Sequence, residues 1–130
     1  MSIPLDLWQL RLEQIHGPGK LMHGSDMSNE EAMQWARERF REGGYCSVRG
    51  WVWHEFSVLD DISSELLQKQ LQPVIIRANY VVFDSAGRFD PGNWVHTSPL
   101  RVFSDSFIFQ TRNTVYLLLG IGYRKVAIKT

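Results

Sequence analysis

The sequence predicts an α+β fold in which two or three helices pack on a strongly curved antiparallel sheet. Three observations favour this class. The stretch Asn93–Gly120 holds the densest run of β-branched and aromatic residues in the chain, and tight turns divide it into short strands. Two earlier segments, 45–58 and 74–84, also have strand character, whereas 28–44 carries clear helix signals. Because short turns join the late strands, the sheet is expected to be antiparallel, and its curvature could make it a small half-open barrel.

The clearest helix signal lies at residues 29–42. Ser28 and Glu31 have the spacing of a capping box, in which each side chain bonds to the backbone N–H of the other residue. Apolar residues at helical spacing follow, and Gly43-Gly44 supplies a left-handed stop at the carboxyl end.

Two further segments have the spacing of amphipathic helices. In Ser2–His16, apolar residues recur every three or four positions after a capping serine. Leu59–Leu71 shows the same periodicity and is followed by Pro73, which cannot continue a helix. Between the first two helices, Lys20–Met27 has no period and is expected to be a loop.

The remaining chain is predicted to be strand and turn. Tyr45–Val58 and Val74–Asp84 are long enough for two long strands. Turn residues then separate four short strands, with turns expected at Ser104-Asp105-Ser106, Arg112-Asn113 and Gly120-Ile121-Gly122.

Alternation along 45–58 assigns its residues to two faces. Cys46 and Val48 belong to an apolar face, and Trp51 and Trp53 are expected to project together from the opposite face. Gly50 lies between the two pairs, where it marks either a β-bulge or a close backbone approach.

Length and composition indicate one globular domain over residues 1–130. Cys46 is the only cysteine, so an internal disulfide is excluded and a reducing compartment is favoured. The longest apolar run, Val115–Leu119, is too short to cross a membrane, and the amino-terminal segment has no apolar run of signal-peptide length. We therefore expect a soluble, cytoplasmic protein.

The charges are unevenly divided along the chain. Residues 1–65 carry 6 basic and 11 acidic residues, and residues 66–130 carry 8 and 3, so the halves have net charges of −5 and +5. The two parts can simply offset one another in the fold. Alternatively, a basic β surface faces an acidic partner or nucleic acid.

The sequence contains few patterns typical of catalytic or metal-binding sites. The four histidines lack the spacing of a metal site, and no Gly-rich turn between a strand and a helix could cradle phosphate. Cys46 lies on the apolar face and is interpreted as an inert buried thiol. Asp84 and Asp90 flank a turn, where aspartate is common for local hydrogen-bonding reasons. No cofactor is expected, and the protein is interpreted as a non-enzyme.

The first candidate binding group is aromatic. Trp51 and Trp53, with Arg49 beside them, resemble the residues that dominate protein–protein hot spots, and single-stranded nucleic acid stacks on similar pairs. The alternative is that a helix, the first one by preference, covers both tryptophans and makes them part of the core.

The second candidate binding group is basic. Arg101, Arg112, Arg124 and Lys125 fall at or near the turns of the late strands, where they could grip phosphate or carboxylate at one end of the sheet. Solvated turn charges are the simpler interpretation.

Three segments carry a resemblance to a known family: SNEEAMQWARERF, DSAGRFDPGNWVHTSP and FIFQTRNTVYLLLGIGYRK. With the tryptophan-bearing strand, they resemble a small uncharacterised family of bacterial and prophage proteins from Met27 onward. WVHTSP and TRNTVYLLLG are the most specific parts. The resemblance implies a bacterial cytoplasm and an accessory or phage-borne gene, and it assigns no catalytic residue. Small proteins from such genes often bind and block a host or defence component.

The function that these features favour is a non-catalytic binding module that docks on another protein and modulates or inhibits it. The alternative is a small nucleic-acid-binding β domain, and an uncharacterised enzyme comes third.

Overall fold

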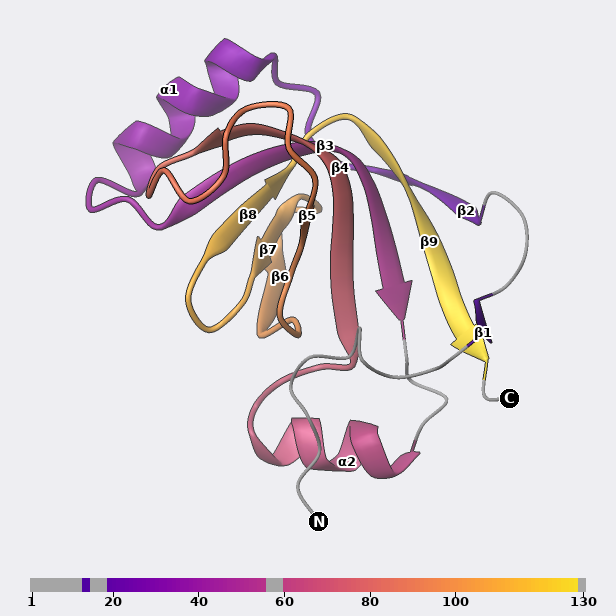
Figure 1. The fold of residues 1–130 in the computed structure, drawn as a ribbon. Helices are drawn as coiled ribbons and strands as arrows, with labels where there is room; N and C mark the ends of the chain where they lie inside the picture. Colours follow the sequence, from indigo (N-terminus) through magenta and orange to yellow (C-terminus); the bar gives the residue numbers. More distant parts are fainter. Residues whose placement is uncertain (1–12, 15–18, 56–59, 129–130) are drawn as a thin grey trace.

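The fold is one curled sheet with two helices, one at each of two ends of the sheet (Figure 1). The computed structural model describes residues 13–14, 19–55 and 60–128. The elements in order are β1 (Glu13–Gln14), β2 (Lys20–His23), α1 (Asn29–Arg39), β3 (Tyr45–Glu55), α2 (Asp60–Gln68), β4 (Val74–Asp84), β5 (Val95–His96), β6 (Val102–Ser104), β7 (Ile108–Gln110), β8 (Val115–Leu118) and β9 (Ile121–Ile128).

The expected α+β class is wrong, because the chain is mostly β. The described residues form a nine-stranded sheet that curls into a half-barrel, with two short helices of 11 and 9 residues. The expected antiparallel order is also wrong, since β3 pairs in parallel with both β8 and β9. Of the expected helix Ser2–His16, the structure describes only Glu13–Gln14, which pairs with β9 as a strand; the rest lies outside the described residues.

Strand β3 is the centre of the sheet. One edge pairs antiparallel with β4 over nearly its whole length. The other edge pairs with β8 over residues 45–48 and with β9 over residues 52–55. The glycine-rich segment after β8 was expected to form a hairpin turn, but Gly120, at a φ of +70°, bends the chain and lets it continue along β3. A glycine-rich segment is typical both of a bend within a strand and of a hairpin turn. The local sequence therefore could not distinguish between the two.

The segment that leads from β5 into β6 connects two strands on opposite sides of the curled sheet. The Thr97 N–H donates to the Ile76 carbonyl at 2.9 Å, and the Leu100 N–H donates to the Val74 carbonyl at 2.9 Å. The next residue, Arg101, donates instead to the Gln110 carbonyl on β7 at 2.8 Å. One continuous segment therefore connects β4 to β7 and encloses the main core.

The face assignment predicted for β3 fails at Gly50. Cys46 and Val48 face the main core, and so do Trp51 and Trp53, which were expected on the opposite face. Gly50 adopts a φ of +61° between Val48 and Trp51, where the alternation of faces shifts by one residue; the pairing with β4 shifts register slightly earlier, between Ser47 and Val48. The sequence identified Gly50 as a possible bulge, but the face assignment of Trp51 and Trp53 ignored the change of face that such an irregularity causes.

Trp51 and Trp53 are core residues, with exposed fractions of 1% and 9%. The indole N–H of Trp51 donates to the Leu119 carbonyl at 3.1 Å. A Cβ atom added to Gly122 would lie 2.3 Å from the Trp51 ring, so only glycine lets the two strands approach here. Trp53 packs edge-on against Phe103 and Phe109, with ring centroids 4.9 and 5.7 Å away.

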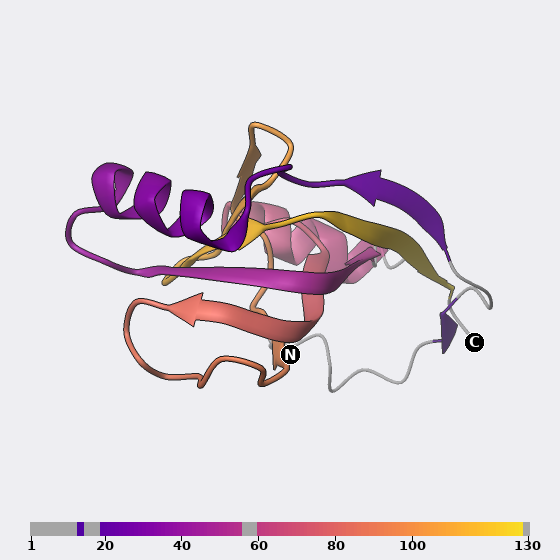
Figure 2. The same cartoon turned by 90° about the horizontal axis from the view of Figure 1, so that it is seen from above.

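Helix α1 covers a second, smaller core on the outside of the curl, along the first half of β3 (Figure 2). Its capping box is formed as the sequence predicts: the Glu31 N–H donates to the Ser28 hydroxyl, and the Ser28 N–H donates to the Glu31 carboxylate. Ala32 and Ala36 are fully buried, and Leu117 lies beneath them in the same cluster. The helix ends earlier than the predicted residue 42, at Arg39 with Phe40 as its cap, and Gly43-Gly44 form the turn that follows, both with positive φ angles.

Three other sequence predictions have clear outcomes. The expected loop Lys20–Met27 is wrong in part, because Lys20–His23 forms β2 against β9. The helix predicted at 59–71 is found at Asp60–Gln68. The turn at 104–106 is confirmed, since Asp105 and Ser106 join β6 to β7 with positive φ angles.

Burial of Trp51 leads to a test with a matched control in the same chain. Trp51→Ala is expected to lower the free energy of unfolding by about 3–5 kcal/mol, because it empties a large core site. Trp94→Ala removes the same side chain from a position that is 59% exposed, and a change within about 0.5 kcal/mol is expected. Urea unfolding of both variants measures the difference. Equal losses would contradict the assignment of Trp51 to the core.

Candidate interaction surface

The aromatic and basic residues singled out from the sequence do not form one site. Trp51 and Trp53 lie in the core and so cannot present an exposed docking face. Arg49 connects β3 to the start of α1: its Nε donates to the Asn29 side chain at 2.7 Å, and its Nη2 donates to the Met27 carbonyl at 3.1 Å.

The four basic residues of the late strands separate into two groups. Arg101 and Arg112 are exposed and flank the same end of the β6–β7–β8 ladder. Arg124, on β9, forms a bidentate ion pair with Glu55, with an Nη2–Oε2 distance of 2.5 Å. Lys125 lies on the other face of β9, opposite His54. The side chains of Arg124 and Lys125 thus point to opposite faces of the sheet.

An exposed row of side chains crosses the sheet on the face turned away from the main core. Strand register places its five residues side by side on five neighbouring strands, β2, β9, β3, β4 and β5. In that order they are Leu21, Tyr123, Val52, Arg77 and His96. We call this set, together with Trp94, the outer row.

Trp94 is the largest exposed side chain of the outer row, with an exposed fraction of 59%. Its ring stacks on His96 with centroids 5.6 Å apart and planes 26° apart. The guanidinium carbon of Arg77 lies 5.5 Å from the ring centroid, within the range of a cation–π contact. These contacts hold a large aromatic side chain in place while leaving much of it accessible to a partner.

Apolar exposure is concentrated on this face. Seven large apolar side chains are exposed in the described part of the chain, and four of them lie here: Leu21, Trp94, Ile121 and Tyr123. α1 covers the corresponding face only along the first half of β3. Contiguous exposed apolar residues of this kind typically mark a binding surface.

The charges of the outer face have one sign. Arg77 and Lys125 contribute positive charge, and the histidines of this face are His23, His54 and His96. No carboxylate occupies the outer positions of β2, β9, the second half of β3, β4 or β5, because Glu55 faces the opposite side with Trp53 and Arg124. The surface is therefore suited to a partner with apolar and acidic groups.

Sequence reasoning missed the outer row. Two signals were present: Trp94 and His96 alternate in the specific segment WVHTSP, and Arg77 interrupts an otherwise apolar strand. Neither signal shows that the two segments are neighbours. The pairing of Arg77 with His96 across β4 and β5 brings them together.

A buried polar cluster near the end of β4 is structural. Asp84 accepts hydrogen bonds from the Arg88 backbone N–H at 2.7 Å and from the Arg88 guanidinium at 3.2 Å. Burial alone would raise the pKa of Asp84, but the hydrogen bonds and charge of Arg88 outweigh it and hold the pKa below its ordinary value. Arg88 also donates to the Thr114 hydroxyl at 3.1 Å, which ties β4 to the turn before β8.

Within residues 13–14, 19–55 and 60–128, no group of three His, Cys, Asp or Glu side chains is arranged to hold a metal ion. A helix long and apolar enough to cross a membrane is likewise not found in this part of the chain.

The family of the chain follows from a comparison with family models. A model described as a domain of unknown function, DUF6957, matches residues 23–129. The chain belongs to the DUF6957 family. This match includes α1, β3 and the whole outer row except Leu21, and it agrees with the resemblance to an uncharacterised family seen in the sequence. No curated protein and no solved structure matches this DUF6957 chain.

The Cys46 thiol gives a test of the core next to Asp84. Burial, with the nearby Asp84 charge, raises the pKa of Cys46 to about 12, and its exposed fraction is zero. Since the thiolate is the reactive form, folded protein at pH 8 is expected to react with a thiol reagent only at the rate at which the core opens. Labelling followed with and without urea measures this. Fast stoichiometric labelling of the folded protein would show that the site is open.

His54 gives a test of pH dependence. Burial lowers its pKa to about 4, and the charges of Lys125 and Arg77 act in the same direction. An unfolded chain with a histidine pKa of about 6.5 therefore takes up a proton that the folded protein does not, and stability falls as the pH drops from about 6.5 to 4.

The variant His54→Gln removes this proton uptake. Its free energy of unfolding is expected to fall less between pH 7 and pH 5 than that of the unmodified protein, as measured by urea unfolding at both pH values. Asp84, whose pKa is lowered by Arg88, is the same in both proteins and so does not enter the difference between them. An equal fall in both proteins would exclude His54 as the source.

Proposed function

We propose that this protein is a non-catalytic binding module that docks on another protein through the outer row and modulates it. The observation that carries the proposal is the run of exposed apolar and aromatic side chains in register across five strands, with Arg77 and Lys125 and no carboxylate among them. A rigid β face with an anchored tryptophan loses little conformational entropy on binding. The expected partner surface combines an apolar centre with acidic side chains.

The biological setting is part of the proposal. The resemblance to bacterial and prophage proteins supports a bacterial or phage-borne gene whose product acts in the cytoplasm on a host or defence component. The single cysteine is consistent with a reducing compartment.

The second candidate is a single-stranded nucleic-acid-binding domain. The observation that favours it is the combination of Trp94 and Tyr123 with Arg77 on a sheet face, because bases stack on such rings and cations follow the phosphates. The two candidates differ in their response to salt. Affinity that depends on phosphate contacts falls steeply between 50 and 200 mM salt, about 10³-fold or more for six contacts, whereas an aromatic docking face is much less sensitive.

Truncation of the outer row tests both candidates. Trp94→Ala and Tyr123→Ala are each expected to weaken partner binding by about 2 kcal/mol or more while leaving the melting temperature unchanged, because both side chains are exposed. Leu67→Ala is the matched control, since Leu67 is 62% exposed on α2, outside the outer row. The measurement is quantitative capture from bacterial lysate, with and without nuclease, followed by titration of the purified partner.

The outcomes are distinct. Capture that survives nuclease and is lost in the Trp94 and Tyr123 variants supports protein docking. Loss of the captured material on nuclease treatment supports the nucleic-acid alternative. Binding that is unchanged in both outer-row variants would show that the outer row is not the docking surface.

A further inference from the structure

Arg77 lies within the outer row with its hydrogen-bonding capacity unused. Its side chain is exposed on β4, and its guanidinium carbon lies 5.5 Å from the centroid of the Trp94 ring. Among the described residues, no oxygen accepts a hydrogen bond from this guanidinium group and no carboxylate forms an ion pair with it. The N–H donors of Arg77 are therefore available to an acceptor on a partner.

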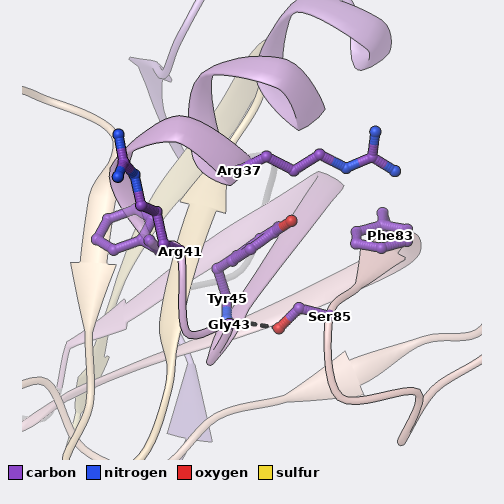
Figure 3. Close-up of a pocket in the computed structure, with 7 residues that line it drawn as sticks. Arg37, Arg41, Gly43, Tyr45, Phe83 and Ser85 are labelled. Atoms are coloured by element: carbon purple, nitrogen blue, oxygen red, sulfur yellow. Dashed lines mark hydrogen bonds between the residues drawn. The ribbon is translucent and has the colours of Figure 1, made fainter.

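Other exposed arginines do not belong to the outer row. Arg37 and Arg41 line a hollow between the carboxyl end of α1 and the end of β4, where their guanidinium groups point away from each other (Figure 3). Arg101 and Arg112 flank the end of the β6–β7–β8 ladder. Arg77 is therefore the guanidinium group that a partner docked on the outer row meets.

The accessible apolar neighbours of Arg77 lie across the sheet rather than along its own strand. On β4, the next residues on the same face are Ile75, which is fully buried, and Asn79, which is polar. Across the sheet, Val52 lies beside Arg77, and Tyr123 lies beside Val52. A partner that contacts both Arg77 and these apolar side chains therefore runs across the strands.

The spacing of side chains across the strands favours a helical partner segment. Neighbouring strands lie about 4.8 Å apart, so the outer row presents its side chains at about that interval. Residues three or four positions apart on a helix are separated by about 5–6 Å, whereas same-side residues of an extended chain are about 6.7 Å apart. A helix also packs on this face of the sheet already, since α1 lies against the first half of β3.

The charge of the outer face determines which helix it accepts. Arg77 and Lys125 are positive, and no carboxylate among the described residues lies on this face to neutralise them. A carboxylate matches a guanidinium group, because two parallel N–H···O bonds can join them. Contact with the Trp94 ring restricts the Arg77 side chain before binding, so less rotamer freedom is lost when the carboxylate binds.

We propose that the partner docks through an acidic amphipathic helix that lies across the outer row and places one carboxylate on Arg77. An apolar side chain three or four residues away on that helix packs on Val52 and Tyr123. Arg77 is then a specificity-determining residue, because it selects an acidic helix over a neutral or basic one. The proposal rests on the docking function proposed for the outer row and adds the shape and charge of the partner.

Selection from a phage library of random peptides tests the shape of the partner segment. Peptides of about 16 residues are long enough, since a helix of about 13 residues spans the five strands of the outer row. Clones that also bind the Trp94→Ala protein are discarded, so the remaining clones depend on the outer row. They are expected to carry Asp or Glu three or four positions from Leu, Ile, Phe or Trp. A separation of two positions, or no enriched clone at all, would overturn the helix.

A charge pair tests the role of Arg77. One enriched peptide is made in two forms, with Glu or with Gln at its acidic position, and each form is titrated into the folded protein. The Glu form is expected to bind about tenfold more tightly or better. The Arg77→Gln protein is expected to bind both forms equally. Because a displaced Trp94 ring would weaken both forms alike, loss of this preference identifies contact between Arg77 and the carboxylate.

Arg101→Gln is the matched control, since it removes the same charge from an exposed position outside the outer row and is expected to keep the preference for Glu. Loss of the preference in this control would show that the peptide responds only to net charge, and the proposal would be wrong. If Arg77→Gln kept the preference while Trp94→Ala abolished binding, docking on the outer row would stand and the role of Arg77 would not. Failure of the two proposals is therefore distinguishable.

Discussion

The close approach of Trp51 to Gly122 is the contact on which the curl of the sheet depends. β3 needs its large indole inside the core, and β9 must pass directly beside that ring, where no side chain has room. The conformation of Gly50 turns Trp51 inward, and the bend at Gly120 brings β9 past it. The three glycines and the tryptophan therefore act together: without the turn at Gly50, the tryptophan would face solvent, and without Gly122 it would collide with the neighbouring strand.

This bend divides the sheet into two regions with different surroundings. Before it, β3 and β8 carry apolar residues on both faces, because the main core lies on one side and α1 on the other. After it, β3 lies beside β9, and the outer face carries partly or fully exposed residues such as Val52 and Tyr123. The position of α1 therefore decides where the exposed face begins, and Arg49, bonded to Asn29 and Met27, fixes the start of the helix next to the bend.

Local signals in the sequence predicted local structure well. The capping box at Ser28 and the turn at Asp105-Ser106 were both found from a few residues, because each depends on short-range hydrogen bonds and φ angles. The class and the strand order were not predictable in the same way. The parallel pairing of β3 with β8 and β9 joins residues about 70 positions apart, and nothing in either segment states the direction of its partner.

The candidate sites were missed for a related physical reason. Alternation assigns a residue to a face only while the strand stays regular, so one glycine at position 50 was enough to reverse the assignment of Trp51 and Trp53. Trp94, by contrast, drew no attention, because a two-residue strand is too short to show a period. The hollow between the carboxyl end of α1 and the end of β4, lined by residues such as Tyr45, Phe83 and Ser85, is another set that only the three-dimensional structure brings together.

The arginines show most clearly how the structure sorts residues that look equivalent in the sequence. Arg49, Arg88 and Arg124 are bound to backbone or side-chain oxygens and so stabilise the fold. Arg39 and Arg77 lie over the exposed faces of tryptophan rings, where they hold an aromatic side chain in place. Arg37, Arg41, Arg101 and Arg112 are exposed, and their side chains make no hydrogen bond or ion pair among the described residues. Because a guanidinium group is never neutral at physiological pH, it stays in solvent unless the fold supplies an oxygen acceptor or a ring, and the bonded arginines mark the places where this fold does so.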